Sequence, residues 1–139
     1  MNTRQTLLIV KPDAVSRNLT GRILAEVESR GFEIRGLRRA RLARPQVETF
    51  YQEHVGRPFY DPLCDYMSSG PVVLVRLEAD AAVPRLREIV GATDPNQAAP
   101  LTLRRMFAVD KGSNSVHASD SDASAERELG LFAGFLSES

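Results

Sequence analysis

The sequence has few of the residues that form disulfides and most protein metal sites. Its 139 residues include one cysteine, Cys64, two histidines and no tryptophan. A single cysteine cannot form an internal disulfide and supplies no pair of thiolate ligands, which is typical of proteins in a reducing cytosol. We therefore expect a cytoplasmic protein in which Cys64 is a small buried hydrophobic residue.

An excess of one charge is also absent. The chain carries 18 basic and 18 acidic side chains, so no net charge favours nucleic acid or a membrane surface as partner. Its apolar start, Thr6–Val10, is closed by Lys11, Pro12 and Asp13, and such a run is too short for a signal sequence or a membrane span. We expect no membrane and no nucleic-acid partner, and any anion site must be local.

Several common catalytic and metal-binding motifs are missing as well. The two histidines, His54 and His117, lie far apart without an HExxH or CxxC motif, which argues against structural zinc. No GxxxxGK[ST] motif is present, which excludes a P-loop. The contiguous letters "HASD" do not indicate a serine-protease triad, because triad residues converge from distant segments. The acidic residues after His117 lack the glycine and glutamate spacing of a calcium loop.

The pattern that is present predicts one domain, residues 1–139, in which strands and helices alternate. Strands are expected at Gln5–Lys11, Phe32–Leu42, the run "VVLVRL" from Val72, and "SVHA" around His117. Helices are expected to begin near Thr20, Pro45, Asp80, Thr102 and Ser121, with a short one in "LCDYM". This order predicts an α+β fold of the ferredoxin-like split βαβ type, a four-stranded antiparallel sheet with helices packed on it.

The second of these helices has a regular apolar pattern. Val47, Phe50, Tyr51 and His54 recur at the spacing of one helix face. The pattern therefore predicts that His54 is a packed side chain rather than a nucleophile.

His117 is the better candidate for chemistry, because it stands among hydroxyl, amide and carboxylate side chains in "NSVHASDS". Lys11, Arg87 and Arg104 each lie near the end of a predicted element, and together they would form a pocket for phosphates. An imidazole with a pKa of about 6.5 is mostly neutral at pH 7 and can attack phosphorus, and Glu128 could hold the ring. The alternative is a structural histidine with scattered surface arginines.

Several motifs, spread in order over nearly the whole chain, resemble one family. They are "TLLIVKPDAV", "FYQEHVGRPFYDPLCDYMSSGPVV", "GATDPNQAAP", Arg104 and "NSVHASDS". In these the sequence resembles the nucleoside diphosphate kinases. The resemblance implies a ferredoxin-like fold and a ping-pong transfer of the terminal phosphate from a nucleoside triphosphate to a nucleoside diphosphate through a phosphohistidine.

The resemblance also implies a role for each matching site residue. His117 would be the nucleophile, Glu128 its orienting carboxylate and Ser119 a hydroxyl that supports the pair. Lys11 and Asn114 would bind the ribose hydroxyl and the phosphates, and Lys11 would also take part in catalysis. The remaining phosphate contacts would come from Tyr51, Arg87, Thr93 and Arg104, whereas Phe59 would stack on the base and Leu63 would flank it.

Cofactor and partners follow from the same resemblance. Mg²⁺ would arrive on the phosphates of ATP, GTP or another nucleotide, and the chain would form a homo-oligomer, either a tetramer or a hexamer. Base specificity should be weak, because stacking on Phe59 does not read base identity. Leu101 and Ala118 replace glycines that are usual in the family. The alternative function is a catalytically impaired nucleotide-binding or interaction module, against which the intact set of site residues argues.

Overall fold

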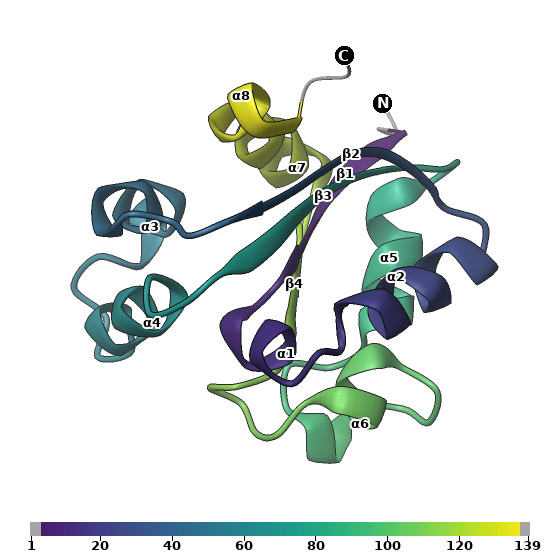
Figure 1. Cartoon of the computed structure of the whole chain (residues 1–139), viewed down its shortest axis with the longest axis horizontal. Helices are drawn as coiled ribbons and strands as arrows, with labels where there is room; N and C mark the ends of the chain where they lie inside the picture. The colour runs from purple at the N-terminus through teal and green to yellow at the C-terminus, as the bar shows by residue number, and fades with distance from the viewer. Residues whose placement is uncertain (1–3, 137–139) are drawn as a thin grey trace.

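The computed structural model describes residues 4–136, and its centre is a four-stranded antiparallel sheet (Figure 1). The strands are β1 (Gln5–Val10), β2 (Glu33–Ala40), β3 (Val72–Glu78) and β4 (Val116–Ala118). Their order across the sheet is β2-β3-β1-β4, so the predicted central position of β3 is confirmed. The predicted α+β class with a four-stranded antiparallel sheet is also confirmed.

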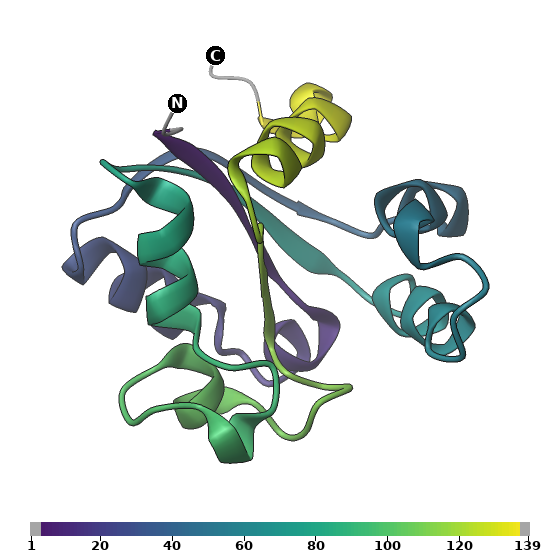
Figure 2. The ribbon, with the colours of Figure 1, turned by 180° about the vertical axis from the view of Figure 1, so that it is seen from behind.

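Helices pack on both faces of this sheet (Figures 1 and 2). Helices α2 and α5 cover one face, α7 and α8 lie on the other, and α3 and α4 form a hairpin that projects beyond the ends of β2 and β3. The helices are α1 (Pro12–Ser16), α2 (Thr20–Ser29), α3 (Arg44–Phe50), α4 (Tyr60–Met67), α5 (Ala82–Val90), α6 (Leu103–Phe107), α7 (Asp122–Leu131) and α8 (Ala133–Leu136), with short 3-10 helices η1 (Gln52–His54) and η2 (Pro95–Gln97).

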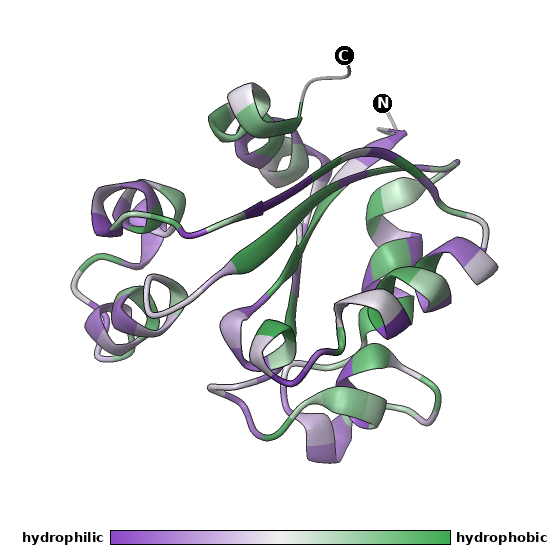
Figure 3. Ribbon diagram, viewed as in Figure 1, coloured by the Kyte–Doolittle hydropathy of each residue, from purple (hydrophilic) through white to green (hydrophobic). Residues whose placement is uncertain are grey.

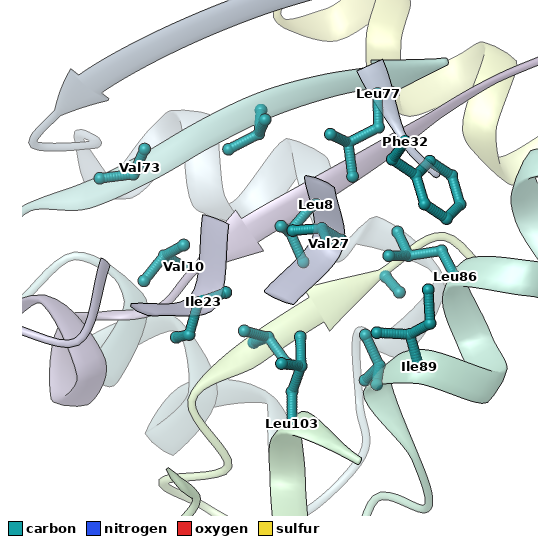
Figure 4. Close-up of a cluster of buried hydrophobic side chains, with 14 of the residues drawn as sticks. Leu8, Val10, Ile23, Val27, Phe32, Val73, Leu77, Leu86, Ile89 and Leu103 are labelled. Carbon is teal, nitrogen blue, oxygen red and sulfur yellow. The ribbon is translucent and has the colours of Figure 1, made fainter. Parts of the chain in front are cut away.

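The core under α2 and α5 is built from alternate residues of the strands. Leu8 and Val10 of β1 point to this face, because successive side chains of a strand face opposite sides. They pack with Ile23 and Val27 of α2 and with Leu86 of α5, all fully buried (Figure 4). This face is therefore closed by apolar contacts.

A second core lies on the opposite face. Leu7 and Ile9 of β1 pack there with Phe50 of α3, Cys64 of α4 and Phe132. Cys64 is fully buried, as predicted. The edge strand β2 contributes less apolar surface than its neighbour. It is strongly hydrophilic near α3, whereas β3 is hydrophobic (Figure 3).

Two of the residues expected near helix starts do not cap their helices. Thr20 is the first residue of α2, and the N-cap position is taken by Leu19, which makes no side-chain cap. Asp80 does not cap α5, because Ala81 occupies that position with a φ of 49° and the Asp80 carboxylate pairs with Arg4.

The helix starts expected near Thr102 and Ser121 are confirmed, and both residues cap their helices. Thr102 accepts a hydrogen bond from the backbone nitrogen of Arg105 at 3.3 Å. Ser121 accepts one from the backbone nitrogen of Ser124 at 3.0 Å. In both cases the hydroxyl satisfies a backbone donor of the first helical turn.

The helix predicted through His54 ends earlier than expected. Helix α3 stops at Phe50, and His54 lies in η1 with its ring centroid 6.1 Å from that of Tyr51. Phe50 and Tyr51 are buried as the pattern indicates, but the His54 side chain is 35 % exposed.

Pro12 also begins a helix, α1, where only the end of a strand was expected, because proline suits a first helical turn. Among residues 4–136, no helix has the length and apolarity needed to cross a bilayer.

Candidate active site

Strand β4 determines the direction of the His117 side chain. His117 pairs with Ile9 of β1 in an antiparallel register, so the two side chains lie on the same face. Its neighbours Val116 and Ala118 belong to the core under α2 and α5. Because of this alternation, His117 faces the second core, where its side chain stays 18 % exposed.

Glu128 of α7 holds the His117 ring. Its Oε1 lies 2.9 Å from Nε2 of His117 and accepts a hydrogen bond from Oγ of Ser119 at 2.7 Å. Glu128 and Ser119 are both buried. A carboxylate accepts but does not donate, so Nε2 carries the imidazole hydrogen and Nδ1 keeps a free lone pair.

Phe50 forms the apolar side of the histidine environment. Its ring meets that of His117 edge to face, with centroids 5.0 Å apart and planes at 74°. Burial lowers the pKa of His117, with smaller opposing effects from Glu128, and Lys11 and Arg104 lower it further. A lowered pKa keeps the imidazole neutral at pH 7, which is the form that can act as a nucleophile.

His117 opens into a cavity of about 800 Å³. Ten of the residues proposed for the site line it, and Ser119 lies behind them, bonded to Glu128. The ten are Lys11, Tyr51, Phe59, Leu63, Arg87, Thr93, Arg104, Asn114, His117 and Glu128. The structure therefore brings together side chains that are widely separated in the sequence.

Other lining residues were not anticipated as parts of the site. They include Phe50, Glu53, His54, Pro62, Tyr66, Lys111, Gly112, Ser113, Ala118 and Asp120. Phe50 and His54 belong to the helical stripe that also contains Tyr51, which indicated packing rather than a cavity, whereas Ala118 directly follows His117 in a family motif.

Buried positive charge gathers at one end of the cavity. The amine of Lys11 donates to Oδ1 of Asn114 at 2.8 Å, and the amide nitrogen of Asn114 donates to the backbone oxygen of Thr93 at 3.3 Å. Burial and, to a smaller extent, the charge of Arg104 lower the pKa of Lys11 to about 8, with Asp13 acting in the opposite direction. Lys11 is thus a cation with little solvation and one polar partner, which suits a phosphate oxygen.

Arg104 and Arg87 complete this end. The guanidinium of Arg104 donates to the backbone oxygens of Gly91 and Val116, each at 2.9 Å. Burial, together with nearby Arg87, lowers the pKa of Arg104 to about 10, so it stays charged at neutral pH. Arg87 donates to the backbone oxygen of Ala118 at 3.2 Å. Both guanidinium groups are fixed by backbone carbonyls and keep donors available for an anion.

Tyr51 adds an unpaired hydroxyl to the cavity wall. Its oxygen is buried and has no hydrogen-bond partner among residues 4–136. Burial raises the pKa of this phenol, and the negative charge of Glu128 adds to the effect. A buried hydroxyl without a partner is costly, so a polar group bound beside it would relieve that cost.

The part of the cavity wall formed by α4 and the residue before it, the stacking end, includes apolar side chains. Phe59, just before α4, is 48 % exposed, and Leu63 lies one helical turn further on. An exposed aromatic ring at a cavity mouth can stack on a planar base. The cavity wall thus combines a cationic end, a stacking end and the His117 side chain.

No group of three or more metal-ligating side chains occurs within the described part of the chain.

Leu101 and Ala118, which replace usual family glycines, differ in their backbone conformation. Leu101 adopts a φ of 68°, a left-handed conformation that favours glycine, and is 70 % exposed. Ala118 has ordinary strand geometry in β4.

Known proteins resemble this chain in both sequence and fold. A family model described as nucleoside diphosphate kinase matches residues 4–135. The nucleoside diphosphate kinase of Persephonella marina is 47% identical over 132 residues, which cover 95% of this chain and 94% of that protein.

Solved structures agree with the sequence relatives. A crystal structure of the Aquifex aeolicus nucleoside diphosphate kinase has a TM-score of 0.91 and 43% identity, covering 93% of this chain and 94% of that one. The Halobacterium salinarum nucleoside diphosphate kinase, solved in complex with CDP, has a TM-score of 0.92 and 35% identity, covering 97% of this chain and 91% of that one.

Proposed function

The chain belongs to the nucleoside diphosphate kinase family and transfers the terminal phosphate between nucleotides through a phosphohistidine, and we propose that His117 is the residue that carries the phosphoryl group. The observation that carries this assignment is the pairing of Nε2 with the buried Glu128. That contact fixes the tautomer and leaves Nδ1 as the nucleophile.

The proposed reaction consists of two mirrored half-reactions. The lone pair of Nδ1 attacks the γ-phosphorus, a nitrogen–phosphorus bond forms, and the bond from that phosphorus to the β–γ bridging oxygen breaks with its electron pair leaving on the diphosphate. The proton on Nε2 stays beside Glu128. A terminal oxygen of the acceptor diphosphate then attacks the same phosphorus and His117 is regenerated.

The cationic end of the cavity would stabilise the negative charge of the phosphates. Lys11, Arg87 and Arg104 would bind the phosphate oxygens, where negative charge is spread in the transition state. Thr93 and Asn114 lie beside them, and the Tyr51 hydroxyl would gain a partner. Each charge-assisted hydrogen bond contributes roughly 1.5 to 3 kcal/mol.

We also propose Mg²⁺ as the cofactor, bound to the phosphates of the nucleotide. The phosphate end of the cavity carries Lys11, Arg87 and Arg104 rather than a cluster of carboxylates, so a dication fits there only together with the anionic phosphates. When bound, it would neutralise charge on the phosphate oxygens.

Base specificity is proposed to be weak, for ATP, GTP and other nucleotides alike. Phe59 shares the cavity wall with apolar Leu63 and Pro62, and its ring centroid lies 5.1 Å from that of His54, so we propose stacking as the main contact with a base. Specificity constants for ADP, GDP, CDP and UDP should differ modestly. A preference above roughly 10⁴ would require hydrogen-bond readout of the base and would contradict this proposal.

We propose that the protein is a cytoplasmic homo-oligomer, a tetramer or a hexamer. Large hydrophobic side chains are exposed at well-separated positions, with Leu37 at 51 % and Val109 at 62 %, and β2 is an edge strand of the sheet. Exposed apolar side chains and open strand edges favour association. Light scattering would separate the two assemblies from a monomer. The cytoplasmic location is supported by the single cysteine.

Labelling with radioactive phosphate tests the assignment of His117. Incubation with γ-labelled ATP and magnesium, without an acceptor, should give a phosphoenzyme that is labile in acid and stable in base, and any nucleoside diphosphate should discharge it. His117→Ala should abolish the label, whereas His54→Ala, the matched histidine control, should label normally. Label that survives in His117→Ala would place the nucleophile elsewhere, and nucleotide binding without label would favour the impaired module.

A further inference from the structure

One largely buried carboxylate outside the set of proposed site residues joins several segments around the cavity. Asp13 lies in the first turn of α1, two residues after Lys11, and its side chain is 11 % exposed. It accepts hydrogen bonds from the Tyr66 hydroxyl and from both the backbone nitrogen and the hydroxyl of Ser115, at 3.2 and 2.8 Å. Arg17 also donates to it, at 3.0 Å.

The Tyr66 contact ties down the stacking end of the cavity. Tyr66 belongs to α4, the helix that carries Leu63 and follows Phe59. Its hydroxyl donates to the Asp13 carboxylate and also accepts from the backbone nitrogen of Asp13, at 3.2 Å. This reciprocal pair is a polar link from the projecting α3–α4 hairpin to the end of β1.

The Ser115 contacts tie down the cationic end. Ser115 has a φ of 72°, an unfavourable conformation for a residue other than glycine, and it is fully buried. Besides its bonds to Asp13, its backbone oxygen accepts from the backbone nitrogen of Lys11 at 2.8 Å. The preceding residue, Asn114, holds the Lys11 amine. Asp13 thus stabilises the turn that places the Lys11–Asn114 pair.

We propose that Asp13 is a positioning residue that sets the separation between the two ends of the nucleotide cleft. Its carboxylate is the common acceptor for Tyr66, on the base side, and Ser115, on the phosphate side. The inference rests on the proposed function, since it assigns these two ends to the base and the phosphates. Asp13 acts through its partners and needs no contact with the nucleotide.

His117 is held by a different set of contacts. Its strand pairing with Ile9, its bond to Glu128 and its packing on Phe50 involve none of the partners of Asp13. Loss of the Asp13 carboxylate should therefore impair nucleotide binding more than the intrinsic reactivity of the imidazole.

Steady-state kinetics of two variants test this role. Asp13→Ala removes both acceptor oxygens of the carboxylate, and Tyr66→Phe removes only the hydroxyl. In each variant KM for ATP and for every nucleoside diphosphate should rise about tenfold, with kcat within about threefold. The double variant should be no worse than the more affected single one, because both break one link. Tyr60→Phe is the matched control, since Tyr60 is on the same helix but outside the cavity lining, and its KM should not change.

A phosphoryl donor without a nucleoside separates positioning from a general structural role. Phosphoramidate can phosphorylate a histidine directly: the new nitrogen–phosphorus bond forms on His117 as the donor's phosphorus–nitrogen bond breaks and, after proton uptake from water, ammonia leaves. The rate of this labelling in Asp13→Ala should stay within about twofold of the unaltered protein, while labelling by ATP at low concentration falls about tenfold.

The outcomes of this pair of measurements are distinct. An equal loss with both donors would show that Asp13 supports His117 or the fold, and no loss with either would show that the link is dispensable; both results overturn the proposal. If the unaltered protein accepted phosphate from neither donor, the assignment of His117 would fail instead.

Discussion

The face of the sheet that packs on α2 and α5 differs from the face that carries His117 in what is buried there. On the first face the residues of β4, Val116 and Ala118, join an apolar core. On the second, the same strand presents His117 beside the buried carboxylate of Glu128. The comparison teaches that one strand can supply both packing and chemistry when its alternate side chains are assigned to different faces.

The largest effect is expected from truncating a side chain on the face that packs on α2 and α5. Leu8→Ala removes a fully buried side chain of β1 that packs under α2, so the free energy of unfolding should fall by about 2–5 kcal/mol. Urea denaturation measures this loss. Because Leu8 points away from the cavity, the rate of phosphoenzyme formation in the remaining folded protein should not change. A large loss of rate in folded protein would break the division between the two faces.

On the face that carries His117, Glu128→Ala should mainly lower the rate of phosphoenzyme formation. The substitution leaves Nε2 of His117 and the hydroxyl of Ser119 without their shared acceptor, so phosphoenzyme formation should slow by about 10²-fold or more. Rapid-quench labelling with ATP gives the rate. Glu128→Gln is the control, since its amide oxygen can still accept from Nε2, and it should retain more activity than the alanine variant.

Arg104, which lines the cavity, and Arg57, which does not, allow a matched comparison. Arg104→Ala removes a buried guanidinium from the phosphate end, and kcat/KM should fall about 10- to 100-fold. Arg57 is exposed in the loop before α4 and outside the cavity lining, so Arg57→Ala should have little effect. Equal small effects would remove Arg104 from the proposed phosphate site.

The lowered pKa of Lys11 predicts an alkaline limb in the pH profile. Lys11 has a pKa of about 8, so its charge is present below pH 8 and is lost as the pH rises through that value. Above pH 8, kcat/KM should therefore fall by about tenfold per pH unit. Lys11→Arg should shift this limb to higher pH, because a guanidinium stays protonated. A limb that remains near pH 8 in Lys11→Arg would assign it to another group.

The smallest effect is expected in a loop that belongs to neither face. Leu101→Gly replaces an exposed side chain held at a φ of 68°, and the free energy of unfolding should increase by about 0.5–1 kcal/mol. Thermal unfolding would reveal the change as a higher midpoint. A lower midpoint would show that the Leu101 side chain makes contacts worth more than the backbone strain.

Much of the fold could be predicted from local pattern. The β-branched runs gave β1 and β3, and the hydroxyls of Thr102 and Ser121 marked real helix starts. That Thr20 and Asp80 do not cap their helices has a tertiary cause, since a cap depends on how the chain approaches the helix. The Asp80 carboxylate pairs with Arg4, a residue far away in the sequence.

The site was predictable as a set of residues but not as an arrangement. Family motifs identified the lining from Lys11 to Glu128, yet Tyr66 and Phe50 carried no sign of their contacts. Tyr66 meets Asp13 across 53 positions of sequence, and Asp13 meets Ser115 across 102. No local periodicity contains such pairings, because they depend on strand register and on the path of α4.

The buried position of Cys64 gives the protein a built-in reporter of local motion. Its thiol is the only one in the sequence and points from α4, the helix of the proposed base side of the cleft, into the second core. A thiol reagent can reach it when α4 moves away from α3 and the second core, so the reaction rate in native conditions measures how often this hairpin opens. A bound nucleotide that bridges the two ends of the cleft should slow that reaction, and the degree of slowing reports how firmly each nucleotide holds the hairpin in place.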